Sequence, residues 1–336
     1  MRLGQNPSKD KLLAYQPARL GIALLSYIPS MAGYFEHSLE IMRYQIASIR
    51  HSTGMDFDLL VFDNGSCDET VSELQRMQRD GWIDMLIASR HNLGKIGALN
   101  WILGAMPNEF ICYADSDVLF RPRWADNSLR ILESFPRVGI VSAQPCFDDI
   151  LRGSGKAHLA LENDPRFQSE SRTLDASLLD EYAAGVGLDP ERLKIVKDAP
   201  SRLITNRENG VSAVVGATHM QFVMPRLVAQ EIVPLPVSYG LGRLEDRNFN
   251  LKVDAAGYLH LSTLAAYVWH MGNVPDKKTI DEVQTMGLLE MLSAPLQKPQ
   301  KTGGWAIRVM KRVARFGVFR AMLYRLYGFL FKLYAQ

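Results

Sequence analysis

The 336-residue sequence contains only three cysteines, and their spacing excludes the common cysteine frameworks. Cys67, Cys112 and Cys146 form neither a CxxC pair nor a Cys/His pattern with zinc spacing. We expect each to behave as a small hydrophobic residue in a reducing, cytosol-like compartment. The chain also lacks an uncharged apolar run of 18 residues, so no transmembrane helix is predicted. Residues 1–16 lack the apolar core of a secretory leader.

Acidic residues are missing from the C-terminal end of the chain. Residues 291–336 hold nine Lys and Arg and no Asp or Glu, so residues 1–290 hold 29 basic and all 36 acidic residues, a net charge of −7. An acidic body disfavours nucleic acid as a partner, because it repels phosphates. A basic tail instead favours an anionic surface. We therefore predict a domain over 1–290 and a separate tail over 291–336.

Short apolar runs alternate with segments of helical periodicity over the first part of the chain. This alternation predicts a mostly parallel sheet covered by helices on both faces. Strands are expected at 20–27, 57–62, 82–88, 109–114 and 138–143, and helices at 33–51, 68–80, 95–106 and 123–134. In such sheets, ligands bind outside the carboxyl ends of the strands. Tyr27, Asp63 and Asp115 all lie at or just past such ends.

Residues 146–209 break the regular alternation. This stretch is polar, contains several Gly and Pro, and has the pattern of only one short helix, at about 189–196. A long irregular insertion in a compact domain is usually a functional loop or a lid, so we predict an acceptor-facing insertion here. Strand-like residues return at 211–224 and 258–269, on either side of a predicted helix at 244–256.

Two carboxylates, Asp115 and Asp117, follow the apolar run at 109–114, with Ser116 between them. Like charges this close at the end of a buried strand raise each other's proton affinity unless a cation balances them. Oxygen ligands of this kind suit Mg²⁺ or Mn²⁺, and such an ion can hold a diphosphate. An N-cap for the helix near Pro122 would explain one of the two carboxylates but not both.

Four segments, in order, resemble family 2 glycosyltransferases of the GT-A fold. They are similar to the family's acidic turn at 63–70, its Asn-x-Gly-x-x-x-Ala-x-Asn helix start at 92–100, its DxD motif at 115–117 and the helix that carries its base at 244–251. The resemblance covers 63–270, reaches the 146–209 insertion only weakly and does not extend to the tail. It implies a Rossmann-like mixed sheet flanked by helices, and the tail's own residue pattern adds a C-terminal amphipathic helical appendage.

The metal residues that this resemblance implies are Asp117, Asp115 and His270. Asp117 is expected to bind the ion directly, whereas Asp115 is expected to touch the ribose or a metal-bound water. In the family's pattern, a late histidine after the last strand completes the metal shell. The alternative for His270 is a structural role, as for most histidines in such places.

The predicted nucleotide-sugar pocket gathers polar residues from several strand ends. Its members are Ser26, Tyr27, Asp63, Asn92, Gly94, Lys95, Asp115 and Ser116. Asp63 can accept the ring N–H of a uracil-like base, or it can be a turn carboxylate bonded to its own backbone. Gly94 lets the backbone approach a ligand. Lys95 at a helix N-terminus suits a nearby phosphate, with a solvated lysine as the alternative, and Tyr27 fits either the pocket or the core.

Asp246 is the predicted general base, and Glu245 is expected to orient it or to hold an acceptor hydroxyl. Neighbours on a helix project about 100° apart, so only one of the two easily faces the sugar. The alternative is an exposed acidic pair near a helix N-terminus, which the helix dipole favours.

The residues and the resemblance together predict a metal-dependent, inverting glycosyltransferase of the hexosyl or a related class. It would move a sugar from a nucleotide donor, with a UDP-sugar favoured, to a hydroxyl of a glycan or lipid-linked acceptor in polysaccharide or glycolipid assembly. Mn²⁺ or Mg²⁺ would be the cofactor. The alternative is a non-catalytic scaffold that binds nucleotide sugars. A sugar-phosphate nucleotidyltransferase is disfavoured, because residues 26–30 lack a Gly-rich, Arg-containing phosphate loop.

Residues 305–336 have the pattern of a basic amphipathic helix. Arg308, Lys311, Arg312 and Arg315 share one face, and apolar residues fill much of the opposite side. Such a helix suits an anionic membrane surface, with about 1 kcal/mol from each basic residue near the lipid. This predicts a peripheral protein on the cytoplasmic, inner face of the cell membrane. A helical hairpin packed on the domain or on a second subunit is the alternative.

Overall fold

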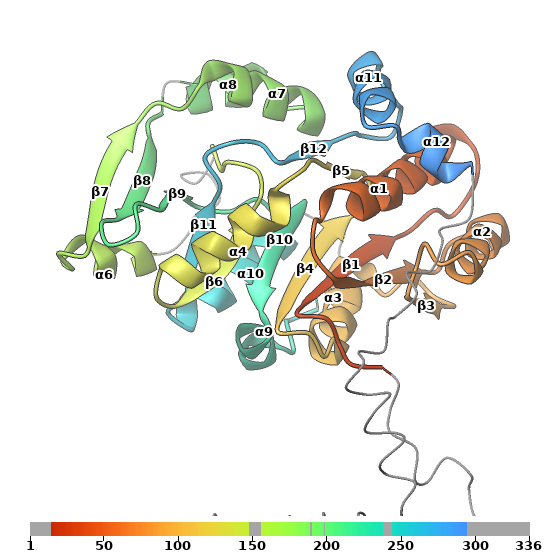
Figure 1. Cartoon of the computed structure of the whole chain (residues 1–336), viewed down its shortest axis with the longest axis horizontal. Coiled ribbons are helices and arrows are strands. Elements are labelled where there is room, and N and C mark those ends of the chain that lie inside the picture. The colour runs from red at the N-terminus through yellow and green to blue at the C-terminus, as the bar shows by residue number, and fades with distance from the viewer. Residues whose placement is uncertain (1–14, 148–155, 189, 198, 238–243, 294–336) are drawn as a thin grey trace, which may run out of the picture. The chain divides into compact units, whose positions relative to one another are not determined.

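The computed structural model describes residues 15–147, 156–188, 190–197, 199–237 and 244–293, without the side chains of residues 156, 192 and 244–247. A mixed sheet of ten strands has helices on both faces, and a sheet of two strands lies beside it (Figure 1). The large sheet has the strand order β3-β2-β1-β4-β10-β6-β11-β9-β8-β7. This arrangement confirms the predicted fold class, a mixed α/β sheet flanked by helices. The expectation of a mostly parallel sheet is wrong, because β10 and the strands beyond β11 pair in antiparallel fashion.

Four neighbouring strands at one end of the large sheet run parallel to one another. They are β3 (Met85–Ser89), β2 (Phe57–Asn64), β1 (Leu20–Ser26) and β4 (Phe110–Asp115). Buried parallel strands read as continuous apolar runs, which is why the sequence pattern located them. Alternate side chains point to opposite faces, so Ile22 and Leu24 of β1 join one core while Ala23 joins the other.

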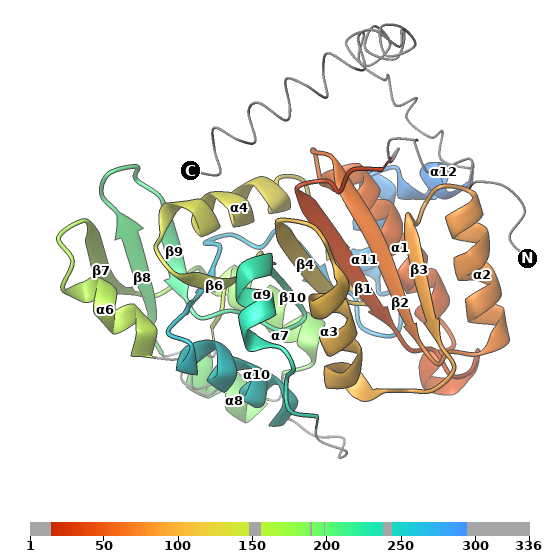
Figure 2. The same ribbon diagram turned by 90° about the horizontal axis from the view of Figure 1, so that it is seen from below.

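Helices enclose these two cores, one on each face of the sheet (Figure 2). The first core includes residues of α1 (Ser38–Ser52), α2 (Asp68–Arg79), α4 (Trp124–Ser134), α11 (Lys277–Thr285) and α12 (Leu288–Leu292). The second includes residues of α3 (Gly94–Ala105), α9 (Arg226–Ile232) and α10 (Leu244–Ala255). The predicted helices before residue 146 all correspond to helices of this list.

The sheet changes direction at β10, which runs antiparallel to both of its neighbours, β4 and β6. Next to β6 lies β11, in parallel, and the last three strands then follow in antiparallel pairs. These strands are β10 (Gln221–Pro225), β6 (Val138–Ser142), β11 (Leu259–Ser262), β9 (Ser212–Val215), β8 (Ser201–Asn206) and β7 (Phe167–Arg172). The predicted strand-like stretch at 211–224 is therefore divided between β9 and β10, which are not neighbours.

The small sheet pairs β5 (Val118–Phe120) with β12 (Val268–His270) in antiparallel register, with Val118 opposite His270. β5 begins three residues after β4 ends, so the chain passes from the large sheet to the small one through residues 116 and 117. His270 consequently lies beside Asp117, although the two are far apart in the sequence.

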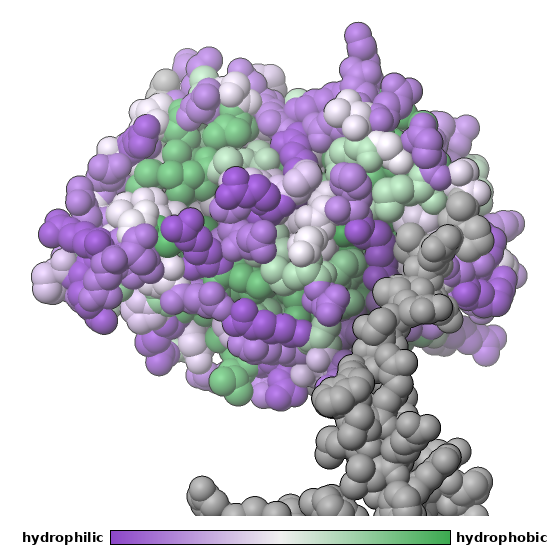
Figure 3. Space-filling model, viewed as in Figure 1, coloured by the Kyte–Doolittle hydropathy of each residue, from purple (hydrophilic) through white to green (hydrophobic). Residues whose placement is uncertain are grey.

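The 146–209 insertion is more regular than predicted. Its described residues contain β7, β8 and the helical segments η2 (Lys156–His158), α6 (Leu159–Glu162), α7 (Ala176–Val186) and α8 (Pro190–Lys197). The expectation of one short helix is therefore wrong. The strand β7 has no apolar run, because five of its six residues are exposed, and so the sequence pattern did not indicate it. Leu179 and Tyr182 of α7 and Val196 of α8 form a small core of their own. Figure 3 shows apolar side chains gathered in the upper left of the face in view.

Most of the predicted tail, residues 294–336, lies outside the described residues, so its membrane-binding helix stays a prediction. Within the described ranges, no helix combines the length and the apolar content needed to cross a membrane.

Candidate active site

The carboxyl ends of β1, β2 and β4 meet at one edge of the sheet. Ser26 lies opposite Asp63 in the β1–β2 pairing, and Leu25 lies opposite Asp115 in the β1–β4 pairing. The Ser26 hydroxyl and Oδ1 of Asp63 are both buried and have no hydrogen-bond partner among the described residues. Buried polar atoms are rarely unpaired in proteins, so this edge is suited to a polar ligand.

Asp63 is a buried carboxylate whose two oxygens have different environments. Its Oδ2 accepts a hydrogen bond from the backbone N–H of Ser66 at 3.3 Å, as a turn carboxylate does, while Oδ1 is unpaired. Burial raises the pKa of Asp63, and hydrogen bonds from Ser66 and Gly65 oppose this rise only in part. The turn role and a ligand-binding role are therefore compatible, because they use different oxygens.

Asn64 joins the end of β2 to the loop before α3, a role that the sequence pattern did not single out. Its amide nitrogen donates to Oδ1 of Asn92 at 3.0 Å, and its own Oδ1 accepts from the backbone N–H of Leu93 at 2.8 Å. Oδ1 of Asn92 also accepts from the backbone N–H of Gly94 at 2.8 Å. Its place as the last residue of a buried strand was the available signal for Asn64.

Gly94 begins α3 with a backbone φ of +71°, a conformation that other residues rarely adopt. Nothing lies within 4 Å of the position that a Cβ would take. Glycine is therefore required here by the backbone conformation, and not by the close approach of another described atom.

Lys95 and Asp115 form an ion pair at the start of α3. Nζ of Lys95 lies 3.1 Å from Oδ1 of Asp115 and 5.6 Å from the centre of the Tyr113 ring. The Tyr113 hydroxyl donates to Oδ1 of Asp115 at 2.6 Å, and the Gln45 amide donates to its main-chain oxygen at 2.5 Å. The alternative of a solvated lysine is wrong. Because the Lys95 and Asp115 side chains are still 25% and 31% exposed, both can also reach a ligand.

Asp117 is balanced less completely than Asp115. Its Oδ2 lies 3.5 Å from Nε2 of His270, and its Oδ1 is buried without a hydrogen-bond partner among the described residues. Its main-chain oxygen accepts from the backbone N–H of Met271 at 2.8 Å, which attaches the turn to the end of β12. Burial raises the pKa of Asp117, His270 opposes the rise, and the charge of Asp115 adds to it. Ser116 completes the turn between the two carboxylates.

A divalent cation fits the Asp117 side of this edge if a ligand supplies further oxygens. Within the described ranges, no three His, Cys, Asp or Glu side chains are grouped to hold an ion by themselves. Mg²⁺ is commonly held by one or two carboxylates together with phosphate oxygens and water, and the unpaired Oδ1 of Asp117 is a ligand of that kind. Nδ1 of His270 accepts from the backbone N–H of Gly272 at 3.2 Å, which places the ring proton on Nε2. His270 can therefore bind a cation through Nε2 only after that proton moves.

Aromatic side chains border this edge on the loop after β1. Tyr27 is 38% exposed and packs edge-on against Phe35, with ring centres 6.1 Å apart, so it is not a core residue. Phe35 also contacts Tyr34 in the short helix η1 (Gly33–Phe35). The main-chain oxygen of Tyr34 accepts from the Asn273 amide at 3.1 Å, which joins this loop to the one after β12.

Glu245 and Asp246 lie in the first turn of α10, and their side chains lie outside the described part of the structure. One turn later, Phe249 packs against Phe222 of β10 with ring centres 5.1 Å apart, and Phe222 packs against Tyr113 of β4 at 5.3 Å. The assignment of Asp246 as the base remains a prediction.

Comparison with known sequences shows which family part of this chain resembles. Residues 34–194 match the family described as Glycosyl transferase family 2. An uncharacterized glycosyltransferase of Haemophilus influenzae is 30% identical over 88 residues, which are 26% of this chain and 27% of that protein. The chain thus matches about a quarter of that relative's length. This match, over a little less than half of the chain, confirms the predicted resemblance to family 2 glycosyltransferases.

Solved structures with a similar arrangement share little sequence with this chain. The mannosyltransferase PcManGT from Pyrobaculum calidifontis, solved with GDP-Man and Mn²⁺, matches with 15% identity and a TM-score of 0.45, over 74% of this chain and 55% of its own. Residues 1–349 of S. aureus TarS, solved with UDP-GlcNAc, match with 14% identity and a TM-score of 0.43, over 83% of this chain and 68% of theirs. Because these structures are so distant from this chain, the roles of its residues are argued from its own geometry.

Proposed function

We propose that this protein is a metal-dependent, inverting glycosyltransferase that acts in polysaccharide or glycolipid assembly. It moves a sugar from a nucleoside diphosphate to a hydroxyl of a glycan or lipid-linked acceptor. The observation that carries the proposal is that Asp63 and Asp117 each have one buried oxygen without a hydrogen-bond partner among the described residues, at one sheet edge together with the Lys95–Asp115 ion pair. A nucleotide-sugar donor requires a carboxylate that binds its nucleobase, a cationic side chain that binds its phosphates and a carboxylate that binds the metal ion.

The base and ribose bind at the ends of β1 and β2. Oδ1 of Asp63 accepts the ring N–H of a uracil-like base, which favours UDP, although a deoxythymidine diphosphate presents the same N–H. The Ser26 hydroxyl lies on the neighbouring strand, opposite Asp63, and forms a hydrogen bond with the same nucleotide. The exposed ring of Tyr27 covers it from the side of the solvent.

The diphosphate binds where β4 ends and α3 begins. Lys95 lies in the first turn of α3, and both a lysine and a helix N-terminus attract phosphate. Asp117, with Asp115 and His270 beside it, would hold Mn²⁺ or Mg²⁺. When bound, such an ion supplies positive charge that stabilises the departing diphosphate.

Asp246 is the proposed base, and Glu245 orients it or holds the acceptor. The acceptor oxygen forms a bond to the anomeric carbon as the bond from that carbon to the diphosphate oxygen breaks. The nucleoside diphosphate leaves with the electron pair of the broken bond, and the proton of the acceptor hydroxyl passes to the carboxylate of Asp246. Attack opposite the leaving group inverts the anomeric configuration.

Two measurements test this proposal. A thermal-shift screen of UDP-, dTDP- and GDP-sugars with and without Mn²⁺ identifies the donor, because a bound donor stabilises the folded protein. Asp246→Asn should then lower transfer by about 10²–10⁴-fold, the usual contribution of a general base, and leave donor binding unchanged. Full transfer by Asp246→Asn would refute the base assignment. Donor binding without transfer to any acceptor in the wild type would indicate a nucleotide-sugar-binding scaffold instead.

For the basic tail over 305–336, we propose binding to the anionic, cytoplasmic face of the cell membrane. Deleting these residues should prevent sedimentation with vesicles that contain phosphatidylserine and should leave donor binding intact. A truncated chain that sediments like the full chain would contradict membrane binding by the tail.

A further inference from the structure

The helix α7, which belongs to the insertion, packs directly against the strand that carries His270. A Cβ at Gly185, in the last turn of α7, would lie 2.9 Å from the main-chain oxygen of His270 and 3.2 Å from its Cβ. Distances below 3.0 Å are essentially never observed for real Cβ atoms, so only glycine permits this approach. Glycine inside a helix costs stability relative to alanine, so this position gives up helix stability for a close contact.

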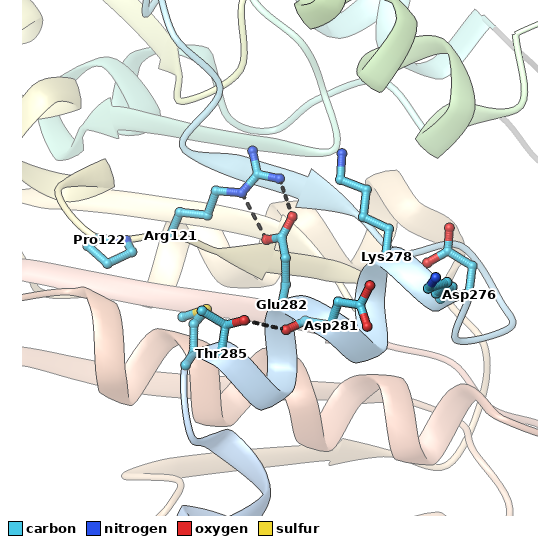
Figure 4. A pocket seen from close by; sticks show the side chains of 9 residues that line it. Arg121, Pro122, Asp276, Lys278, Asp281, Glu282 and Thr285 are labelled. Carbon is cyan, nitrogen blue, oxygen red and sulfur yellow. Dashed lines mark hydrogen bonds and ion pairs between the residues drawn. The ribbon is translucent and has the colours of Figure 1, made fainter.

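A group of four charged side chains, the α7 ion network, holds this helix in place. Arg121, just past β5, donates to the carboxylates of both Glu181 in α7 and Glu282 in α11. Nζ of Lys278 lies 2.9 Å from Glu181 and 3.8 Å from the centre of the Trp269 ring. Figure 4 shows Arg121, Glu282 and Lys278 on the wall of a cavity of about 740 Å³.

The α7 ion network is internally balanced, with two positive and two negative side chains. The Arg121, Glu181 and Glu282 side chains are only 18–22% exposed. Burial tends to raise the pKa of Glu181, but hydrogen bonds from Arg121 and Lys278 hold that pKa below its ordinary value. Since these four charges satisfy one another, we take the network to position α7.

We propose that Gly185 is a positioning residue that sets the distance between His270 and Asp117, with the Arg121–Glu181 ion pair keeping α7 against β12. This inference rests on the proposed function and gives the insertion a role on the metal side of the site. β12 has three residues and pairs only with β5 among the described strands, so it needs support from its other side. The approach of α7 at Gly185 provides that support.

Gly185→Ala should weaken Mn²⁺ binding by roughly 10- to 100-fold, the range for residues that orient metal-binding side chains. Mn²⁺ affinity is measured by calorimetric titration, in parallel at saturating UDP and at saturating GDP. The matched control is Gly104→Ala in α3, where a Cβ would meet nothing within 4 Å. Both variants gain the same helix propensity, so only Gly185→Ala should change the affinity. Thermal unfolding without metal checks that each variant is folded.

A double-mutant cycle distinguishes positioning from a general loss of packing. In a His270→Ala background, Gly185→Ala should change Mn²⁺ affinity no further, because the imidazole whose position depends on Gly185 is no longer there. A full additional loss in that background overturns the inference. If Gly185→Ala does not fold, Glu181→Gln replaces it in the same cycle, because it breaks the ion pair and leaves the space at Gly185 unchanged.

The outcomes for the inference and for the proposed function are distinguishable. If the wild type binds neither nucleotide in a Mn²⁺-dependent way, the proposed function fails. If the wild type binds Mn²⁺ with nucleotide and Gly185→Ala binds it equally well, the positioning inference fails and the proposed function stands.

Discussion

The two carboxylates of the Asp115-Ser116-Asp117 turn are balanced in different ways. Asp115 lies 3.1 Å from Nζ of Lys95, in α3, and accepts a hydrogen bond of 2.6 Å from the Tyr113 hydroxyl, in β4. Asp117 has His270 at 3.5 Å, on a small second sheet, and keeps one oxygen unpaired among the described residues. The side of the edge that we propose for the nucleotide is thus organised by the main sheet itself, whereas the side that we propose for the metal depends on how β5, β12 and α7 pack.

The largest difference between the two sides is expected from Asp117→Asn and Asp115→Asn. Asp117→Asn should reduce Mn²⁺-dependent transfer on the order of 10³-fold, as for loss of a group that stabilises transition-state charge. It should also stabilise the metal-free protein at neutral pH, because burial raises the pKa of Asp117 and the charged form therefore costs stability. Asp115→Asn should instead destabilise the protein, because the ion pair between Lys95 and Asp115 is lost. Transfer assays and urea unfolding measure the two effects.

Equal destabilisation by the two substitutions would show that the two carboxylates are balanced alike, contrary to this comparison.

Lys95→Ala should have the next largest effect, on donor binding. Loss of a charged hydrogen bond costs about 1.5–3 kcal/mol, or roughly 10- to 100-fold in affinity. The affinity for uridine, which has no phosphate, should not change, and titration of UDP and of uridine separates the two. Lys194→Ala, an exposed lysine in α8, is the control. Equal losses for UDP and uridine would place Lys95 away from the phosphates.

Asp63→Asn should lower UDP affinity by roughly tenfold, because a charged acceptor is about twice as strong as a neutral one. In the wild type, burial raises the pKa of Asp63 above the ordinary 3.8, so UDP affinity should fall as pH decreases through that raised pKa. The same shift means that the charged carboxylate costs stability at neutral pH. Asp63→Asn should therefore raise the free energy of unfolding at pH 7 and not below pH 3.8.

Calorimetric titration and urea unfolding across this pH range check both effects. A UDP affinity that does not depend on pH in the wild type would remove Asp63 from the base pocket.

The smallest effect is expected for Glu181→Gln, which weakens the α7 ion network. Loss of hydrogen bonds to a charged group should cost about 1–2 kcal/mol at pH 7, a decrease of a few degrees in Tm. The pKa of Glu181 lies below the ordinary 4.5, so this stabilisation is present above pH 4.5 and is lost as pH falls through the lowered pKa. The difference from wild type should therefore disappear in acid.

Glu191→Gln, an exposed residue of α8, serves as the control for this change. Unchanged thermal unfolding of Glu181→Gln at pH 7 would mean that the ion network does not stabilise α7.

The order of strands and helices and the polar residues of the strand ends were available from the sequence alone. Buried parallel strands are continuous apolar runs, and parallel strands place their carboxyl ends at one edge, so Ser26, Asp63 and Asp115 could be assigned to that edge. These features depend on residues close together in the chain, so a local sequence pattern can predict them. The exposed strand β7 has no such pattern, which is why the sequence did not predict it.

Only the tertiary structure decided which charges pair and which remain unpaired. Lys95 could face solvent or phosphate from its position at a helix start, and it lies against Asp115. His270 approaches Asp117 because β12 pairs with β5, and Gly185 supports β12 because α7 packs on it. These contacts join segments far apart in the chain, and their distances depend on packing in three dimensions rather than on any periodicity along the sequence.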